Sequence, residues 1–228
     1  RLQRMGKTHE YGFMPTASVF NPLLAQMILS AYCPPKAKVL DLFAGGGTRG
    51  FVASSMGHEY TGVELRQEEV DRIKTQMVTL NLLFELICAD STSTTAYDLC
   101  PNTYDFGLTC PPYYNLEVYS DRADDLSNAP NYAAFLRMLE AAVRRYRFAL
   151  KQDSLSVWVV GNFRDSKGNL VDFRGDLVRI AVASGFHLHD DIIWWGAAGN
   201  AVQRCGQFEA NRRSVRVHEH ILIFKKWA

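Results

Sequence analysis

The chain lacks the features that mark membrane, secreted or metal-binding proteins. No apolar run approaches the roughly 18–20 residues that a membrane-spanning helix needs, and the opening residues RLQR do not begin a secretion signal. The five cysteines are an odd number without a C-x-x-C pair, which argues against a disulfide framework and a four-ligand zinc site. His218 and His220 have no evident third ligand. We expect a soluble protein of a reducing compartment, with no metal and no membrane partner.

Net charge is also nearly absent, because 25 Lys and Arg oppose 24 Asp and Glu. Any site for a polyanion must therefore come from local clustering. What is present is apolar: 47% of the 228 residues are hydrophobic, enough for a substantial core. The length suits one large α/β domain, so we expect residues 1–228 to form a single domain. The first residue is not Met, and we expect a chain cut from something longer.

Short β-rich runs alternate with stretches of helical periodicity. Strands are predicted at residues 39–43, 60–64, 84–88, 106–109, 155–160, 192–195 and 220–224. Helices are predicted at residues 21–32, 50–56, 68–81, 132–150 and 176–184. The polar stretch 196–219 shows no helical period, so the last two strands should form an antiparallel pair. The alternation predicts a doubly wound α/β fold with a mostly parallel seven-stranded sheet, helices on both faces and an antiparallel C-terminal strand.

A glycine-rich turn follows the first predicted strand, in the sequence VLDLFAGGGT of residues 39–48. Glycines permit a tight turn and let a ligand approach bare backbone, although such a turn is also a common α/β connection. The turn lacks the Lys-Ser/Thr pair of a P-loop, and Asp41 would repel phosphate. These features argue against a nucleoside triphosphate.

Acidic residues follow three successive predicted strands. Glu64 lies 23 residues after Asp41, a position that suits a grip on ribose hydroxyls, and Asp90 follows the third strand. Because the carboxyl ends of parallel strands meet at one edge of a sheet, the three acids should line one crevice.

Residues 41–48, DLFAGGGT, resemble the S-adenosylmethionine loop of class I methyltransferases, particularly the DNA amino-methyltransferases. This cofactor carries a sulfonium and an ammonium but no phosphate. The resemblance implies that Asp41 and the backbone of residues 43–47 face its methionine part, that Glu64 holds the ribose, and that Asp90 and Ser91 approach the adenine. The upstream segment SVFNPL resembles a further cofactor motif, although Phe20 could equally pack at the start of a helix. The implied cofactor-binding residues are Phe20, Asn21, Asp41, Phe43, Ala44, Gly45, Gly47, Thr48, Glu64, Leu65, Asp90 and Ser91.

A second turn, Cys110-Pro111-Pro112-Tyr113, follows the fourth predicted strand. In isolation it would be read as a structural proline turn, since two prolines fix φ and remove N–H donors. It resembles the Asp/Asn/Ser-Pro-Pro-Tyr motif of enzymes that methylate the exocyclic amino groups of adenine or cytosine. The resemblance implies that the amino nitrogen attacks the methyl group directly. The residue before the prolines and the carbonyl of Pro111 would accept its hydrogen bonds, and Tyr113 would stack on a base flipped out of double-stranded DNA.

Cys110 departs from that motif, because a thiol is a weak hydrogen-bond acceptor. In order of preference, it acts as a poor serine beside the proline carbonyl, it is a covalent nucleophile, or the protein has lost catalysis or handles an unusual base. The second is disfavoured because enzymes that methylate carbon 5 of cytosine place Cys after the prolines.

Local charge points to nucleic acid. Four arginines between residues 204 and 216 oppose only Glu209, so this loop should grip phosphates, although a merely solvated basic loop is the alternative. The predicted nucleic-acid contacts are Tyr114, Asn115, Arg204, Arg212, Arg213 and Arg216. No separate recognition domain fits in the chain, so target recognition is assigned to residues 117–130, 165–174 and 196–217. If these loops read the DNA sequence only weakly, a homodimer, or a fused or separate recognition partner, would compensate.

The resemblance extends from about Phe20 to the C-terminus and is to phage and bacterial modification methyltransferases. It implies an S-adenosylmethionine-dependent DNA methyltransferase of the bacterial or phage-infected cytoplasm, such as a restriction–modification enzyme. Two alternatives stay open: an RNA or protein amide methyltransferase, and a DNA- and cofactor-binding module with little turnover.

Overall fold

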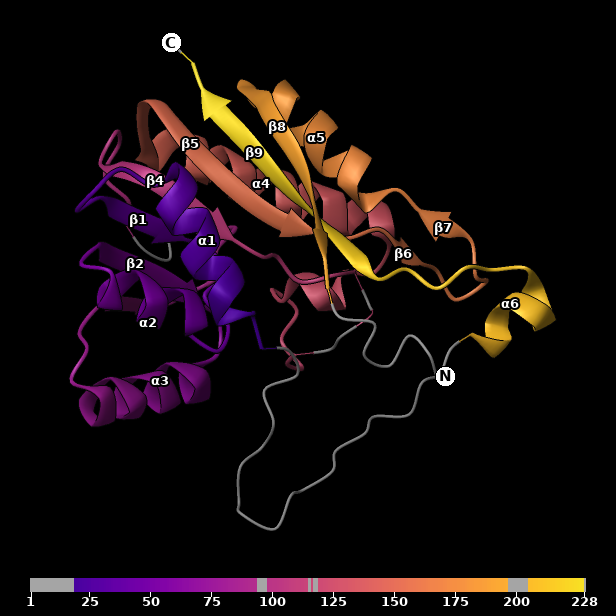
Figure 1. Ribbon diagram of the computed structural model, residues 1–228, viewed down its shortest axis with the longest axis horizontal. Helices are drawn as coiled ribbons and strands as arrows, with labels where there is room; N and C mark the ends of the chain where they lie inside the picture. The colour runs from indigo at the N-terminus through magenta and orange to yellow at the C-terminus, as the bar shows by residue number, and fades with distance from the viewer. Residues whose placement is uncertain (1–18, 94–97, 115, 117–118, 197–204, 228) are drawn as a thin grey trace.

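A seven-stranded sheet forms the centre of the computed structural model, which describes residues 19–93, 98–114, 116, 119–196 and 205–227 (Figure 1). The strands lie in the order β3-β2-β1-β4-β5-β9-β8. Their bounds are β1 (Lys38–Asp41), β2 (Glu59–Glu64), β3 (Glu85–Cys88), β4 (Tyr104–Thr109), β5 (Leu150–Val160), β8 (Phe186–Trp195) and β9 (His218–Lys226). Strands β1 to β5 pair in parallel, and β9 is antiparallel to both neighbours, β5 and β8. The predicted fold class is confirmed.

Helices cover both faces of the sheet. They are α1 (Pro22–Tyr32), α2 (Thr48–Ser55), α3 (Gln67–Leu80), α4 (Tyr132–Ala149) and α5 (Phe173–Ala183). In Figure 1, α1 and α2 lie on the opposite side of the sheet from α4 and α5. Successive side chains of a strand point to opposite faces of the sheet. Accordingly, Val157 packs in the hydrophobic cluster that includes α1, and the next residue, Trp158, packs in the cluster that includes α4 and α5.

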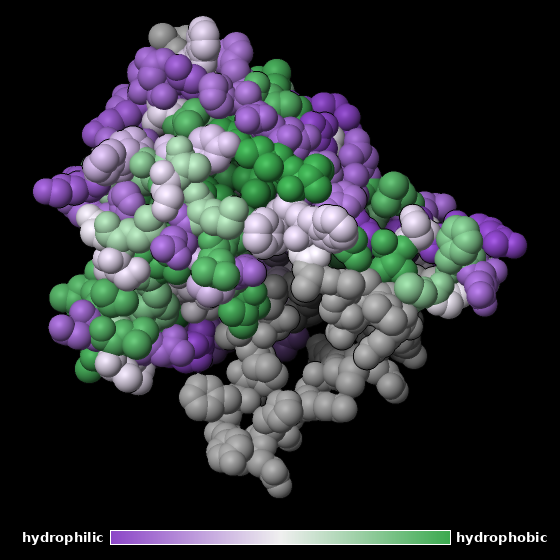
Figure 2. Space-filling model, in the orientation of Figure 1, coloured by the Kyte–Doolittle hydropathy of each residue, from purple (hydrophilic) through white to green (hydrophobic). Residues whose placement is uncertain are grey.

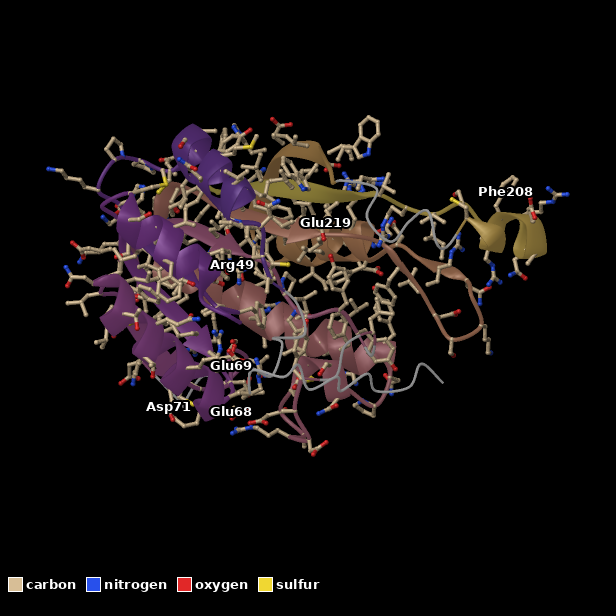
Figure 3. All side chains as sticks on the ribbon, turned by 60° about the horizontal axis from the view of Figure 1, so that its bottom comes forward. Arg49, Glu68, Glu69, Asp71, Phe208 and Glu219 are labelled. Carbon is tan, nitrogen blue, oxygen red and sulfur yellow. The ribbon has the colours of Figure 1, made fainter. Side chains whose placement is uncertain are left out.

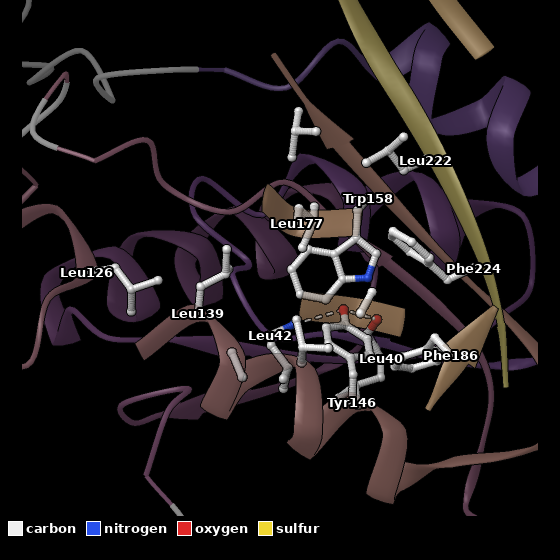
Figure 4. Close-up of a cluster of buried hydrophobic side chains, with 14 of the residues drawn as sticks. Leu40, Leu42, Leu126, Leu139, Tyr146, Trp158, Leu177, Phe186, Leu222 and Phe224 are labelled. Atoms are coloured by element: carbon white, nitrogen blue, oxygen red, sulfur yellow. Dashed lines mark hydrogen bonds between the residues drawn. The ribbon is translucent and has the colours of Figure 1, made fainter. Parts of the chain in front are cut away.

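The face under α4 and α5 holds the largest buried side chains (Figure 4). Tyr146 of α4 lies below the sheet, where its hydroxyl donates to the carbonyl of Leu40 at 2.9 Å and accepts from the amide of Leu42 at 3.1 Å. This contact ties α4 to the end of β1, the strand that carries the glycine-rich turn.

After β1, the chain adds β2 and β3 on one side of this strand, and then returns to place β4 on the other side of β1. Strand β1 therefore lies between β2 and β4, and the β1–β4 junction is a topological switch point. In open α/β sheets, ligands bind beyond the carboxyl ends of the strands at such a point. The register pairs Leu40 with Gly107, so the two motifs predicted from sequence begin at neighbouring strand ends.

The structure adds elements that the sequence pattern did not predict. Residues 163–171 contain a short hairpin, β6 (Phe163–Arg164) and β7 (Leu170–Val171), and η1 (Leu126–Asn128) precedes α4. The stretch 196–219, predicted to lack helix, contains α6 (Gly206–Asn211). This helix has fewer than two turns and no buried residue among those described, so no apolar period could reveal it. Among the described residues, none of the helices combines the length and apolarity needed to cross a bilayer.

Apolar side chains reach the surface over α2 and α3, among polar ones, at the lower left of Figure 2. Val78, Leu80 and Leu83 are exposed there. A shallow groove next to them runs between α1, α2 and α3 and is lined by Pro22, Phe51 and Val52, among others.

Candidate active site

A cavity of about 550 Å³ opens at the carboxyl ends of β1, β2 and β4. Its volume is within the range of small-molecule sites. The wall comes from segments far apart in sequence: residues 42–46, 48–49, 63–66, 90–91, 110–113, 116, 119, 124–126, 216 and 219, together with Phe20. The structure thus brings the glycine-rich turn and the Cys-Pro-Pro-Tyr turn to one cavity.

The glycine-rich turn presents backbone to this cavity. Of the predicted cofactor residues in it, Phe43, Ala44, Gly45 and Thr48 line the wall. The amide of Ala44 donates to the carbonyl of Val63 at 2.9 Å, which fixes the turn against β2. Gly47 lies behind the wall at the N-terminus of α2, with φ of +79° and its Cα facing Ile73 of α3.

Gly47→Ala should destabilise the protein more than Gly57→Ala does. Both glycines have a left-handed φ, +79° and +82°, but a Cβ at Gly47 would lie 3.0 Å from Ile73, whereas nothing lies within 4 Å at Gly57. The left-handed conformation alone costs about 1–2 kcal/mol, and crowding of a packed core adds about 1–3 kcal/mol. Urea unfolding of both variants checks this; equal losses would show that Ile73 yields without cost.

Asp41 holds the two turns together from inside the protein. Its carboxylate is fully buried and accepts hydrogen bonds from the Phe43 amide (3.0 Å), the Thr109 hydroxyl (2.7 Å), the Tyr60 hydroxyl (2.7 Å) and the Arg49 Nε (2.6 Å). Because Thr109 ends β4, this one side chain links the β1 and β4 turns. Asp41 does not line the cavity. The expectation that its side chain faces the ligand is therefore corrected, and we assign it to fixing the turns.

Arg49 neutralises Asp41, and sequence reasoning missed it. It is 4% exposed, donates to the Phe43 carbonyl, and its guanidinium lies 4.7 Å from the centre of the Phe20 ring. Burial alone would lower its pKa, but the Asp41 carboxylate, together with Tyr60 and Cys110, outweighs burial and raises it. The sequence did hold one signal for this ion pair: Arg49, in the first turn of α2, follows eight residues after Asp41, the acid at the end of a buried strand.

The predicted ribose-binding acid, Glu64, lies at the end of β2 and lines the cavity. It is 7% exposed, and its Oε1 accepts from the amide (3.0 Å) and Nε (3.2 Å) of Arg66. Burial raises the pKa of Glu64, and Arg66 opposes the rise. Leu65 and Ser91 also line the cavity, as does Asp90, whose carboxylate accepts from the Thr92 amide at 2.8 Å.

The Cys-Pro-Pro-Tyr turn also lines the cavity, with all four of its residues in the wall. Tyr113 lies edge-on to Phe163 and Phe173, at ring-centre distances of 6.4 and 5.8 Å. Its hydroxyl donates to Glu219 Oε1 at 3.5 Å. Burial raises the pKa of Tyr113 well above its ordinary value, so the phenol stays protonated.

Other predicted contacts lie away from the cavity or outside the described residues. Asn21 caps α1 by accepting from the amides of Leu23 and Leu24, and Tyr114 packs against Tyr132 and Phe135. Both side chains thus have structural contacts, and their predicted contacts with cofactor and nucleic acid stay predictions. Asn115 and Arg204 lie outside the described residues, as do parts of the predicted recognition loops 117–130 and 196–217.

The arginines predicted to grip nucleic acid do not lie together at the cavity. Of those described, only Arg216 lines the cavity. Arg213 donates to the carbonyl of Lys167 at 3.4 Å in the β6–β7 turn, and Arg212 lies over Phe208 of α6. Figure 3 places Phe208 at the far end of the molecule from Arg49. Apart from Arg49, the cavity residues that the sequence did not predict include Arg66 and Glu219, neither of which belongs to a sequence motif, whereas Tyr119 lies in the predicted recognition segment 117–130.

Comparison with known proteins supports the assignment of the fold. A family model described as DNA methylase, of the N6/N4 type, matches residues 6–75, less than a third of the chain. No curated protein matches. TrmN from Thermus thermophilus superposes with a TM-score of 0.61 at 16% identity, over 90% of this chain and 48% of that one. The chain therefore spans about half the length of that relative.

Two further solved structures have similar scores. A SAM-dependent methyltransferase from Methanosarcina mazei gives a TM-score of 0.61 at 14% identity, covering 88% of this chain and 97% of that one. The [4+2]-cyclase SpnF gives 0.62 at 14% identity, covering 91% and 81%. The chain thus has the Rossmann-like fold of S-adenosylmethionine-dependent methyltransferases. Because a cyclase shares it, the reaction has to be argued from the site.

Proposed function

We propose that this protein is an S-adenosylmethionine-dependent methyltransferase that acts on the exocyclic amino group of cytosine or adenine in DNA. One observation carries the proposal: the glycine-rich turn after β1 and the Cys-Pro-Pro-Tyr turn after β4 line the same cavity at the switch point of the sheet. The DNA methylase family match at residues 6–75 supports the same class of substrate.

The cavity wall fits the proposed cofactor. Glycine-rich backbone at residues 43–46 and the half-buried ring of Phe20 form one side, and Glu64 offers a carboxylate where ribose hydroxyls can donate. Arg49, the buried cation here, is committed to Asp41, so the turn has no spare charge for a phosphate. When bound, the cofactor supplies a methyl group activated by its sulfonium.

The second turn would position the substrate amine. The two prolines fix the direction of the turn because their φ angles are locked, and the carbonyl of Pro111 can accept from the amine together with Cys110. The aromatic face of Tyr113 gives a flipped base a surface for stacking, a contact worth about 1–3 kcal/mol in other proteins. Arg216 at the cavity would contact a phosphate of the strand that delivers the base.

Transfer of label tests the proposal directly. The protein is incubated with methyl-labelled S-adenosylmethionine and duplex DNA, and the digested nucleosides are separated by mass spectrometry. We expect N4-methylcytosine or N6-methyladenine. Label in RNA or protein only would assign the site to another substrate, and binding of the cofactor with no transfer to any substrate would indicate a binding module.

Cys110→Ser should keep methyl transfer within about tenfold of the wild type, because a hydroxyl accepts hydrogen bonds at least as well as a thiol. Single-turnover assays measure the rate, and denaturing gels of the wild type with DNA check for an adduct. Loss of transfer in Cys110→Ser, together with a covalent adduct in the wild type, would identify Cys110 as a nucleophile.

A further inference from the structure

Glu219 is a carboxylate that reaches the cavity from a strand that neither motif occupies. It lies at the start of β9, next to β5. Figure 3 shows it toward the middle of the molecule, as it does Arg49. Both Glu219 and Cys110 line the cavity.

The sheet directs Glu219 and Cys110 to the same face. Ile221 and Ile223 of β9 pack in the cluster that includes α1, and Cys110 packs against that cluster too. Because strand side chains alternate, Glu219 shares the face of Ile221 and Ile223. His218 and His220 point to the other face, where His220 contacts Asp191 at 3.0 Å.

The groups around Glu219 fix its carboxylate. The Tyr113 hydroxyl donates to Oε1 at 3.5 Å. A Cβ at Gly161 would lie 3.2 Å from Arg216 and 3.5 Å from the Tyr113 hydroxyl, so those two groups meet beside the same glycine. Burial raises the pKa of Glu219, while Arg216 and the Tyr113 hydrogen bond oppose the rise. On β8, the residue opposite Glu219 is the uncharged Trp194.

We propose that Glu219 supplies the strong hydrogen-bond acceptor for the substrate's amino group that Cys110 does not provide. The inference rests on the proposed function and narrows it to substrates that present an N–H donor at this carboxylate. A charged acceptor forms a stronger hydrogen bond than a thiol. During transfer the nitrogen–carbon bond forms as the carbon–sulfur bond breaks with its electron pair on sulfur, and the proton leaving nitrogen passes to the Glu219 carboxylate.

Binding of nucleosides with and without the amino group tests this independently of turnover. Deoxycytidine and deoxyadenosine are titrated by NMR, each against its analogue that has hydrogen in place of the amino group. The wild type should bind the amino form of its substrate nucleoside about tenfold more tightly, as expected for a hydrogen bond to a charged group. Glu219→Ala should reduce that preference to less than twofold.

Three variants separate this role from a structural one. Glu219→Gln keeps the shape of the side chain but cannot ionise. In the wild type, the preference for the amino form should increase with pH as the Glu219 carboxyl ionises, and Glu219→Gln should lose this increase. Tyr113→Phe tests whether the hydroxyl contact alone matters, and it should retain most of the preference. Glu140→Gln makes the same chemical change on the solvent side of α4, where Glu140 pairs with Arg144, and should match the wild type.

The outcomes are distinct. A preference for the amino form that persists in Glu219→Ala and Glu219→Gln, or a wild type with no preference, would overturn the inference while methyl transfer to DNA continues. Absence of transfer to DNA by the wild type would instead overturn the proposed function, whatever the nucleoside preference.

Discussion

Replacing Arg49 with methionine is expected to lower the free energy of unfolding by about 3–5 kcal/mol, because it leaves the Asp41 carboxylate buried without its counter-ion. Asp41 is 0% exposed and Arg49 is 4% exposed, so water cannot take over the interaction. Urea unfolding followed by circular dichroism measures the loss.

Two comparisons isolate the cause of that loss. The double variant Asp41→Asn/Arg49→Met removes both charges and should be less destabilised than Arg49→Met alone. Arg179→Met removes an arginine whose own side chain is largely exposed where it pairs with Asp176, and should change stability by less than about 1 kcal/mol. If Arg49→Met also fell within about 1 kcal/mol of the wild type, the ion pair would not hold the turns together.

Replacing Glu64 with glutamine is expected to weaken S-adenosylmethionine binding by about 10- to 100-fold, the usual worth of hydrogen bonds to a charged acceptor. Isothermal titration measures the affinity. Glu59→Gln, at the other end of β2 where the side chain is exposed, is the matched control and should bind as the wild type does. Unchanged affinity in Glu64→Gln would remove this residue from the cofactor site.

The pH dependence of cofactor binding follows from the same residue. Burial raises the pKa of Glu64, so the carboxyl takes up a proton at a higher pH than an exposed one. Affinity should therefore be highest above the raised pKa and fall as the pH drops through it, and Glu64→Gln should flatten that fall. The effect on folding has the opposite sign, because the folded state holds the Glu64 proton more tightly than the unfolded chain does. The contribution of Glu64 to the free energy of unfolding therefore decreases as the pH rises from its ordinary pKa through its raised pKa.

The sequence predicted the parts of the molecule that local pattern controls. Apolar strands, helical periods and turn glycines are local signals, and they located the seven strands, the five long helices and the two turns after β1 and β4. Glu64 could be predicted because the end of a strand and the spacing from Asp41 place it at the sheet edge.

The remaining site residues depend on tertiary contacts. Asp41 carries the motif, yet its hydrogen bonds to Tyr60 and Thr109 turn it inward, and only the packed sheet reveals this. Glu219 reaches the cavity because β9 inserts between β5 and β8. The sequence predicted the antiparallel pairing of β9 with β8, but no local pattern encodes its pairing with β5. The arginines of residues 212–216 are close in sequence, but α6 and the β6–β7 turn direct them to different places.

The most direct test of the shared cavity is photochemical crosslinking of methyl-labelled S-adenosylmethionine, followed by mapping of the labelled peptides. We expect label on peptides that contain residues 42–49 and 110–113, and we expect unlabelled cofactor to compete it away. Label confined to another surface, such as the apolar groove between α1, α2 and α3, would contradict the account.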